Sequence, residues 1–102
     1  PVSVFFNIGK SKIASKKDLQ NVKDLVAVAK ENNSKIVVTG YADSKTGSAA
    51  FNQKLSEKRA KVVADALVNM GINRDNIEVV AAGGVNTLSP ISYNRRATVA
   101  VK

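Results

Sequence analysis

The segment from residue 51 to residue 70 constrains the fold more than any other part of the chain. Its apolar side chains recur every three or four residues, which places them on one face of an α-helix, and Gly71 follows as a residue typical of a helix end. A helix with one apolar stripe is stable only when that stripe packs against another element. The stripe consists of Phe51, Leu55, Val62, Val63, Ala66 and Met70.

Strand-like and helix-like patterns alternate on both sides of this helix. Period-2 alternation and short β-branched runs predict four strands. An earlier helix is predicted between the first two strands, because Ser15 with Asp18 three residues later resembles an N-cap and Asn32-Asn33 end the apolar periodicity. The predicted strands are residues 2–8 (ending near Gly9), 35–40, 77–81 (ending at Gly83-Gly84) and 97–101.

The predicted order of elements is β-α-β-α-β-β. Strands that alternate with helices, followed by a closing strand, indicate an α/β (α+β) two-layer sandwich, in which two long helices cover one face of a four-stranded mixed sheet. The chain has 102 residues, a usual size for one domain, and contains no internal repeat or linker. We therefore expect residues 1–102 to form a single domain.

Basic residues outnumber acidic ones, since 16 Lys+Arg against 8 Asp+Glu give a net charge of +8. Such a balance favours nucleic acid, anionic lipid or a charged polymer as a partner. A domain that binds nucleic acid or another polyanion is therefore one candidate. An RNA-binding sheet exposes aromatic rings on its central strands, however, and the predicted second strand, with Ile36, Val37 and Val38, has none.

The chain contains no cysteine and no histidine. Disulfides, thiolate nucleophiles and Cys/His metal sites are excluded, and so is the side chain that most often acts as a general base near neutral pH. No two carboxylates have a spacing that indicates acid–base catalysis. We expect a protein that is not an enzyme and that uses no metal or cofactor.

Targeting signals are absent from the printed residues. No apolar run approaches the roughly 18 residues that a membrane-spanning helix needs. The first residues, Pro1 to Asn7, have the pattern of a strand rather than of a signal peptide. Because the chain opens with proline, we expect a soluble piece excised from a longer protein.

One charged residue lies where an apolar one is expected. At about 100° per residue, Arg59 falls inside the apolar stripe of the second helix, and an unpaired buried charge costs several kcal/mol. Asp43 follows the second strand and lies in the loop that leads to the same helix. One carboxylate and one guanidinium at the same rim suit a zwitterionic ligand. Two other interpretations stay open: Asp43 and Arg59 pair with each other, or Arg59 extends to solvent.

Three motifs resemble the OmpA-like C-terminal domain family. Residues 40–43 (Gly-Tyr-Ala-Asp), the Gly47-Ser48 turn and residues 52–60, with Asn, Leu-Ser and Arg-Ala in order, are similar to its central signature. Residues 5–11 look like its first-strand motif, and residues 94–96 (Asn-Arg-Arg) look like the motif before its last strand. The resemblance covers essentially the whole chain.

The resemblance implies a periplasmic domain, attached to the outer membrane of a Gram-negative bacterium, that holds peptidoglycan by the diaminopimelate of its stem peptide. Asp43 and Arg59 match the family's ligand-binding aspartate and arginine. Asn52 and one of the two residues Arg95 and Arg96 match positions beside the pocket. Strand parity favours Arg95, because it shares a face with the apolar residues of the last strand. Diaminopimelate carries an ammonium and a carboxylate on one carbon, which agrees with the zwitterion inferred from the charges.

The chain departs from the family pattern at three places. The loop after Asp43 is one residue longer than usual, Asn7 stands where an aspartate is more common, and the segment before Asn94 lacks a small helical insert. These differences keep both charges. We expect them to alter the affinity for the ligand rather than its identity.

Overall fold

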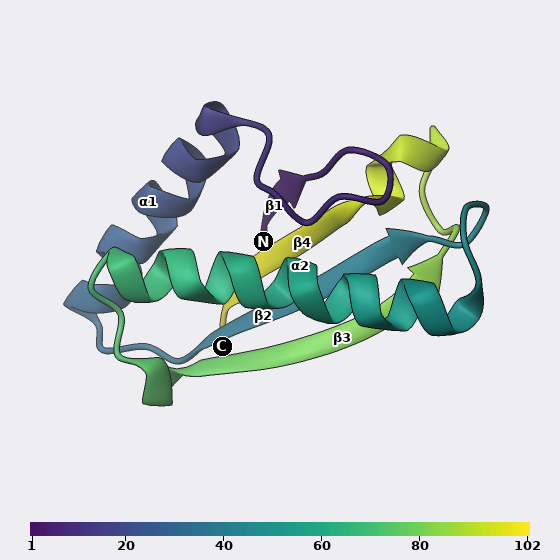
Figure 1. Cartoon of the computed structure of the whole chain (residues 1–102). Coiled ribbons are helices and arrows are strands. Elements are labelled where there is room, and N and C mark those ends of the chain that lie inside the picture. Colours follow the sequence, from purple (N-terminus) through teal and green to yellow (C-terminus); the bar gives the residue numbers. More distant parts are fainter.

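The computed structural model describes all 102 residues and contains the predicted order of strands and long helices (Figure 1). Two short 3-10 helices, η1 and η2, lie before the third and fourth strands. The elements are β1 (Val2–Phe5), α1 (Lys16–Glu31), β2 (Ile36–Asp43), α2 (Ala49–Asn69), η1 (Arg74–Asn76), β3 (Ile77–Val85), η2 (Ile91–Asn94) and β4 (Arg96–Val101).

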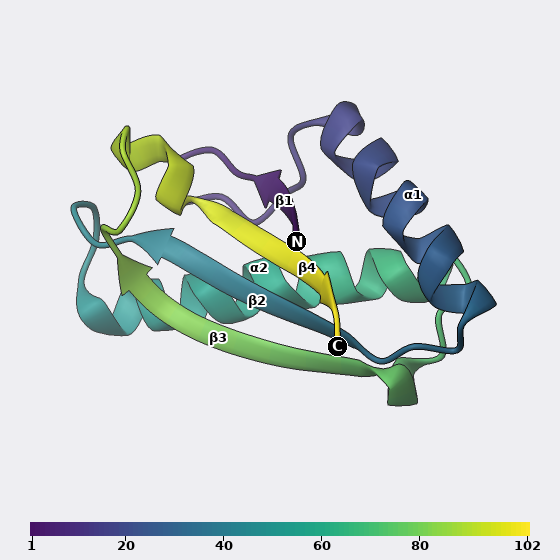
Figure 2. The ribbon, with the colours of Figure 1, turned by 180° about the vertical axis from the view of Figure 1, so that it is seen from behind.

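The four strands form one mixed sheet in the order β1-β4-β2-β3. Strands β2 and β3 are parallel, whereas β4 runs antiparallel to both of its neighbours, β1 and β2. Helix α2 lies across one face of the sheet, and the view from behind shows the opposite face without a helix in front of it (Figure 2). The α/β sandwich expected from the sequence is confirmed. No helix combines enough length and apolarity to cross a membrane.

A single apolar core joins both helices to the sheet. It contains Val22 and Val26 of α1, Val63 and Leu67 of α2, and inward side chains of β1, β2 and β4, including Val38. All of these side chains are buried. Burial of apolar surface is the main favourable term in folding, so this layer holds the helices on the sheet.

The helix ends agree with the local signals in the sequence. Ser15 accepts a hydrogen bond from the backbone N–H of Asp18 (3.2 Å), and Ser48 accepts one from that of Phe51 (3.1 Å). Such caps satisfy backbone N–H groups that have no partner within the helix. Helix α2 ends at Asn69, and Gly71 follows with a φ of +99°, a conformation that glycine adopts without strain.

Three predicted boundaries are wrong. Strand β1 ends at Phe5 instead of near Gly9, and Ile8 is 58% exposed. Strand β3 does not end at Ala81 but continues to Val85, because it stays paired with β2 across an irregularity in register. Strand β2 reaches Asp43, so it carries the ring of Tyr41, which the shorter predicted strand lacked.

The predicted stripe of α2 is also wrong at its first member. Phe51 is 51% exposed, whereas Leu55 and Val63 are buried in the helix–sheet interface. Gly40 of β2 explains how closely the helix approaches the sheet there, because a Cβ atom at this position would overlap the carbonyl oxygen of Ser56. This approach brings the first half of α2 against the end of β2, where the candidate site lies.

Candidate functional site

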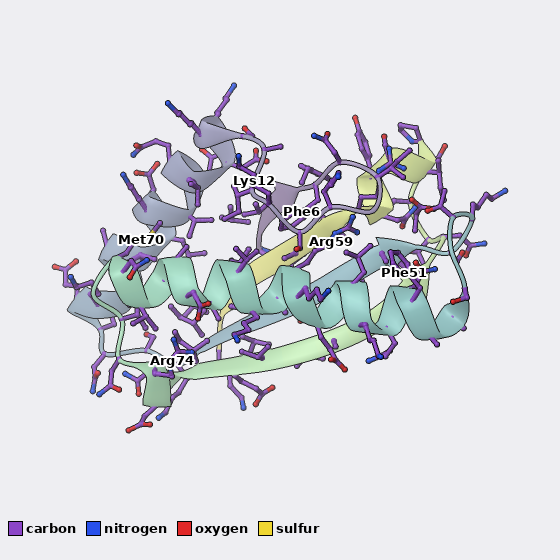
Figure 3. All side chains as sticks on the ribbon, in the orientation of Figure 1. Phe6, Lys12, Phe51, Arg59, Met70 and Arg74 are labelled. Atoms are coloured by element: carbon purple, nitrogen blue, oxygen red, sulfur yellow. The ribbon has the colours of Figure 1, made fainter.

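Arg59 is 0% exposed and lies between α2 and the end of the sheet, where it contacts Phe6 (Figure 3). Its guanidinium donates three hydrogen bonds to backbone carbonyl oxygens: Nε to Lys10 (2.9 Å), Nη1 to Tyr41 (2.9 Å) and Nη2 to Asn7 (3.1 Å). The guanidinium carbon lies 5.2 Å from the centroid of the Phe6 ring, within cation–π range. Arg59 therefore does not extend to solvent, and its direct partners are neutral.

Asp43 is the last residue of β2 and is 2% exposed. Its Oδ1 accepts a hydrogen bond from Thr46 Oγ1 (2.8 Å), and its Oδ2 accepts one from Arg95 Nη1 (3.0 Å). The ion pair of Asp43 is thus made with Arg95 rather than with Arg59. Both open interpretations from the sequence are therefore wrong: Asp43 and Arg59 do not pair directly, and Arg59 does not extend to solvent.

Two guanidinium groups and one carboxylate leave this cluster with an excess of positive charge. Burial and, to a smaller extent, the charge of Arg95 lower the pKa of Arg59 to about 10, while the charge of Asp43 acts in the opposite direction. Arg59 therefore remains protonated near neutral pH. Burial raises the pKa of Asp43, but the hydrogen bonds from Thr46 and Arg95 and the charge of Arg95 outweigh burial, so the net pKa is lowered.

Arg95 and Arg96 extend to opposite faces of the sheet. Arg95 contacts Asp43, and its Nε is buried with no hydrogen-bond partner. Arg96 instead donates to Ser3 Oγ (3.1 Å) and lies 5.3 Å from the centroid of the Tyr41 ring. Strand parity thus selects the arginine that the structure places at the rim. A buried donor without a partner is rare in folded proteins.

Asn52 supports the backbone of the site. It is buried, and its Nδ2 donates to the carbonyl oxygen of Asp43 (3.3 Å). The side chain therefore holds the loop that follows β2 against the first half of α2. The structure brings all four predicted site residues together, with Asn52 touching the backbone of Asp43 and Arg95 touching its carboxylate.

Two further residues shape the site: Thr46, which sequence reasoning missed, and Asn94, which it named only as part of the motif before the last strand. Thr46, in the lengthened loop, donates a hydrogen bond from its hydroxyl to one carboxylate oxygen of Asp43. Asn94 is fully buried and closes the loop before Arg95: it accepts from the backbone N–H of Leu88 (3.1 Å) and donates to the carbonyl oxygens of Leu88 (3.0 Å) and Ile91 (3.1 Å). The signal in the sequence for Asn94 was its position directly before Arg95 in the Asn-Arg-Arg motif.

The structure contains no group of three or more acidic side chains placed to hold a metal ion. The chemistry of the site is that of fixed charges and hydrogen-bond donors. Such an arrangement can bind a ligand that carries both a carboxylate and an ammonium.

Comparisons with known proteins agree with the fold and the motifs. A family model described as the OmpA family matches residues 5–100. The chain is 47% identical over 76 residues to outer membrane protein 40 of Porphyromonas gingivalis, covering 74% of this chain and 20% of that protein. It is 44% identical over 62 residues to the peptidoglycan-binding protein ArfA of Mycobacterium tuberculosis, covering 61% of this chain and 18% of that protein.

A solved structure has the same fold. The peptidoglycan-associated lipoprotein of Burkholderia pseudomallei superposes with a TM-score of 0.83 at 23% identity, covering 100% of this chain and 91% of that one. The chain spans only about a fifth of the length of the two curated relatives, 20% and 18%. The family match nevertheless extends over nearly all of its residues. The chain belongs to the OmpA family.

Proposed function

We propose that this chain binds peptidoglycan non-covalently through the diaminopimelate of the stem peptide and so anchors an envelope protein to the cell wall. The observation that carries the proposal is the cluster of the buried Asp43 and Arg59 with the partly buried Arg95, which combines one carboxylate with two guanidinium groups. Two relatives are named for peptidoglycan, one as binding it and one as associated with it. As expected for its family, the domain is not an enzyme.

The ligand carboxylate would be held by the arginines. Arg59 uses three of its N–H groups for backbone carbonyls, and a guanidinium has five in all. Arg95 has a buried Nε without a partner. These donors converge from α2 and from the start of β4. A bound carboxylate would also reduce the excess positive charge of the cluster.

The ligand ammonium would be held by Asp43. An ionised carboxylate accepts about four hydrogen bonds, and two are provided by Thr46 and Arg95. Because Asp43 is buried, access requires that the exposed loop at residues 44–48 moves and that the Thr46 hydroxyl gives up its position. Lysine in a stem peptide lacks the distal carboxylate and would leave the arginine donors unpaired, which disfavours it.

In the cell, residues 1–102 would act as one anchoring domain of a longer protein on the periplasmic side of the outer membrane of a Gram-negative bacterium. Two or three charge-assisted hydrogen bonds, each about 1.5–3 kcal/mol, suit an affinity between micromolar and millimolar. Many copies tethered to one membrane and sharing one polymer would strengthen this grip. The net charge of +8 would attract the domain to an acidic polymer.

The test is a titration of the chain with free meso-diaminopimelate, followed by backbone amide NMR, together with pull-down on peptidoglycan sacculi. We expect saturable shifts at Asp43, Arg59 and Arg95 in the wild type, and none in a folded Asp43→Ala variant. Arg74→Ala is the matched control, because Arg74 is an exposed arginine in an ion pair far from the site (Figure 3). Absence of shifts and of pull-down in the wild type would overturn the proposal.

The same protein and variants also test the alternative, a domain that binds nucleic acid or another polyanion. Binding to a polyanion falls steeply with salt and does not depend on Asp43. Binding to short DNA or RNA that is lost between 50 and 200 mM salt, with no response to diaminopimelate, would favour that alternative.

A further inference from the structure

A pocket lies between the β1–α1 loop and α2, near the arginine site. Its volume is about 150 Å³. Its lining combines two lysines with two apolar side chains, and none of its side chains belongs to the proposed diaminopimelate site. The residues that line it are Gly9, Ser11, Phe51, Lys54, Leu55 and Lys58.

The two lysines of this pocket are one helical turn apart on α2. Like charges at this spacing disfavour a helix by a few tenths of a kcal/mol, unless an anion lies between them. None of the three ion pairs in the structure includes Lys54 or Lys58. Their positive charges are therefore free to bind an anion from outside the chain.

The pocket and the arginine site share their walls. The β1–α1 loop supplies Gly9 and Ser11 to the pocket, and its Asn7 and Lys10 carbonyl oxygens accept hydrogen bonds from Arg59. Lys58 directly precedes Arg59 on α2.

Phe51 connects the pocket to the loop after Asp43. Its ring lies so close to Gly47 of that loop that a Cβ there would come within 2.9 Å of it. Figure 3 shows Phe51 toward the N-terminal end of α2 and Arg59 near the middle of the helix. The loop after Asp43 therefore borders both Asp43 and this pocket.

We propose that Lys54 and Lys58, with Ser11 and Phe51, form a second subsite that binds another carboxylate of the peptidoglycan stem peptide. This inference rests on the proposed function. The stem peptide carries carboxylates on both sides of diaminopimelate: the α-carboxylate of the preceding γ-linked glutamyl residue and the terminal carboxylate of alanine. Two ammonium groups and a hydroxyl suit a carboxylate, while Phe51 and Leu55 offer apolar surface to the adjacent methylene or methyl groups.

The test compares pairs of ligands that differ in one charge. The glutamyl pair is the tripeptide L-alanyl-γ-D-glutamyl-meso-diaminopimelate and its analogue with the glutamyl α-carboxylate amidated. The alanyl pair is the tetrapeptide ending in D-alanine and its C-terminal amide. Free meso-diaminopimelate serves as the reference ligand. The pair that shows a difference identifies which carboxylate is bound.

We expect the wild type to bind one acid about 3- to 10-fold more tightly than its amide, as two partly exposed charge pairs allow. The Lys54→Ala/Lys58→Ala variant should bind acid and amide equally, with its affinity for free diaminopimelate unchanged within about twofold. Alanine is a strong helix former, so α2 should be retained.

The matched control is Lys17→Ala/Lys61→Ala, which removes the same charge from exposed positions outside the pocket. It should keep the preference for the acid. Equal binding of acid and amide by the wild type, or an equal loss of preference in the control, would overturn the subsite while leaving the proposed function intact. If the wild type binds neither diaminopimelate nor the peptides, both proposals are wrong.

Discussion

The two ends of the sheet use the same types of charged residue in opposite ways. Near β3, at the end of the molecule far from the site, Arg74 and Asp65 form an ion pair of 3.0 Å in which the side chains are 61% and 45% exposed. At the rim of β2, Arg95 and Asp43 form an ion pair of the same length, but Asp43 is buried and Arg59 lies beside it.

The difference between these two pairs lies in their solvation. An exposed pair exchanges water for a partner at nearly equal free energy and contributes about 0–1 kcal/mol. A buried cluster has lost its water, so each hydrogen bond within it matters and each missing partner is costly. The distance between the two charges is therefore a poor guide to their role, and burial is a better one.

Removal of Arg59 should have the largest effect. In Arg59→Ala, three backbone carbonyls lose their donor, and a cavity forms between α2 and the sheet. We expect the free energy of unfolding to fall by about 3 kcal/mol or more, measured by urea denaturation. Arg59→Lys should recover only part of this loss, because an ammonium cannot reproduce the planar fork. A loss below about 1 kcal/mol would place Arg59 in the same class as the exposed charges.

Neutralising Asp43 should mainly affect the ligand. Asp43→Asn keeps the shape of the side chain but removes the charge that faces Arg95. We expect affinity for meso-diaminopimelate to fall about 10- to 100-fold, the equivalent of one charge-assisted hydrogen bond. Asp65→Asn, which neutralises the carboxylate of the exposed pair, is the control and should bind normally. Unchanged affinity in Asp43→Asn would contradict its assignment to the ammonium.

Asn94 tests whether the loop before β4 positions Arg95. In Asn94→Ala three hydrogen bonds within that loop are lost. Unfolding free energy should fall by about 1–3 kcal/mol, and the NMR signal of Arg95 should shift in the free protein. Ser92→Ala in the same short helix is a suitable control. If affinity and the Arg95 signal both stay unchanged, the loop does not position this arginine.

The pH dependence of stability tests the contribution of the Asp43 carboxylate. The pKa of Asp43 is lowered in the folded state, so its stabilising contribution is fully present above its ordinary value of 3.8 and is lost as the pH falls through the folded value. Wild-type stability should therefore decline with acidification below about pH 5 more steeply than that of Asp43→Asn. Parallel curves for the two proteins, recorded by urea denaturation between pH 6 and 2, would argue against this coupling.

Arg74→Ala should have the smallest effect. Its ion pair with Asp65 is exposed, so we expect a change in unfolding free energy within about 0.5 kcal/mol and no change in ligand affinity. Added salt should remove even this difference, because exposed charges are screened. A loss comparable to that of Arg59→Ala would remove the contrast between the two ends of the sheet.

Local signals in the sequence determined the order of elements and the helix ends. The cap at Ser15 and the stop at Gly71 depend on neighbouring residues, so they are visible in a short window. Arg59 also stood out locally, as a charge inside an apolar stripe. The motif that resembles the family placed Asp43 and Arg95 within reach of it.

Tertiary structure alone decided which charges meet. Strand β4 inserts between β1 and β2, and this brings Arg95 to Asp43 across 52 residues of sequence. Two of the three carbonyls that hold Arg59 come from a loop 49 and 52 residues away. The extension of β3 to Val85 likewise follows from its pairing with β2. Periodicity records only which side of an element is buried, whereas the partner of a buried charge depends on how distant elements are packed together.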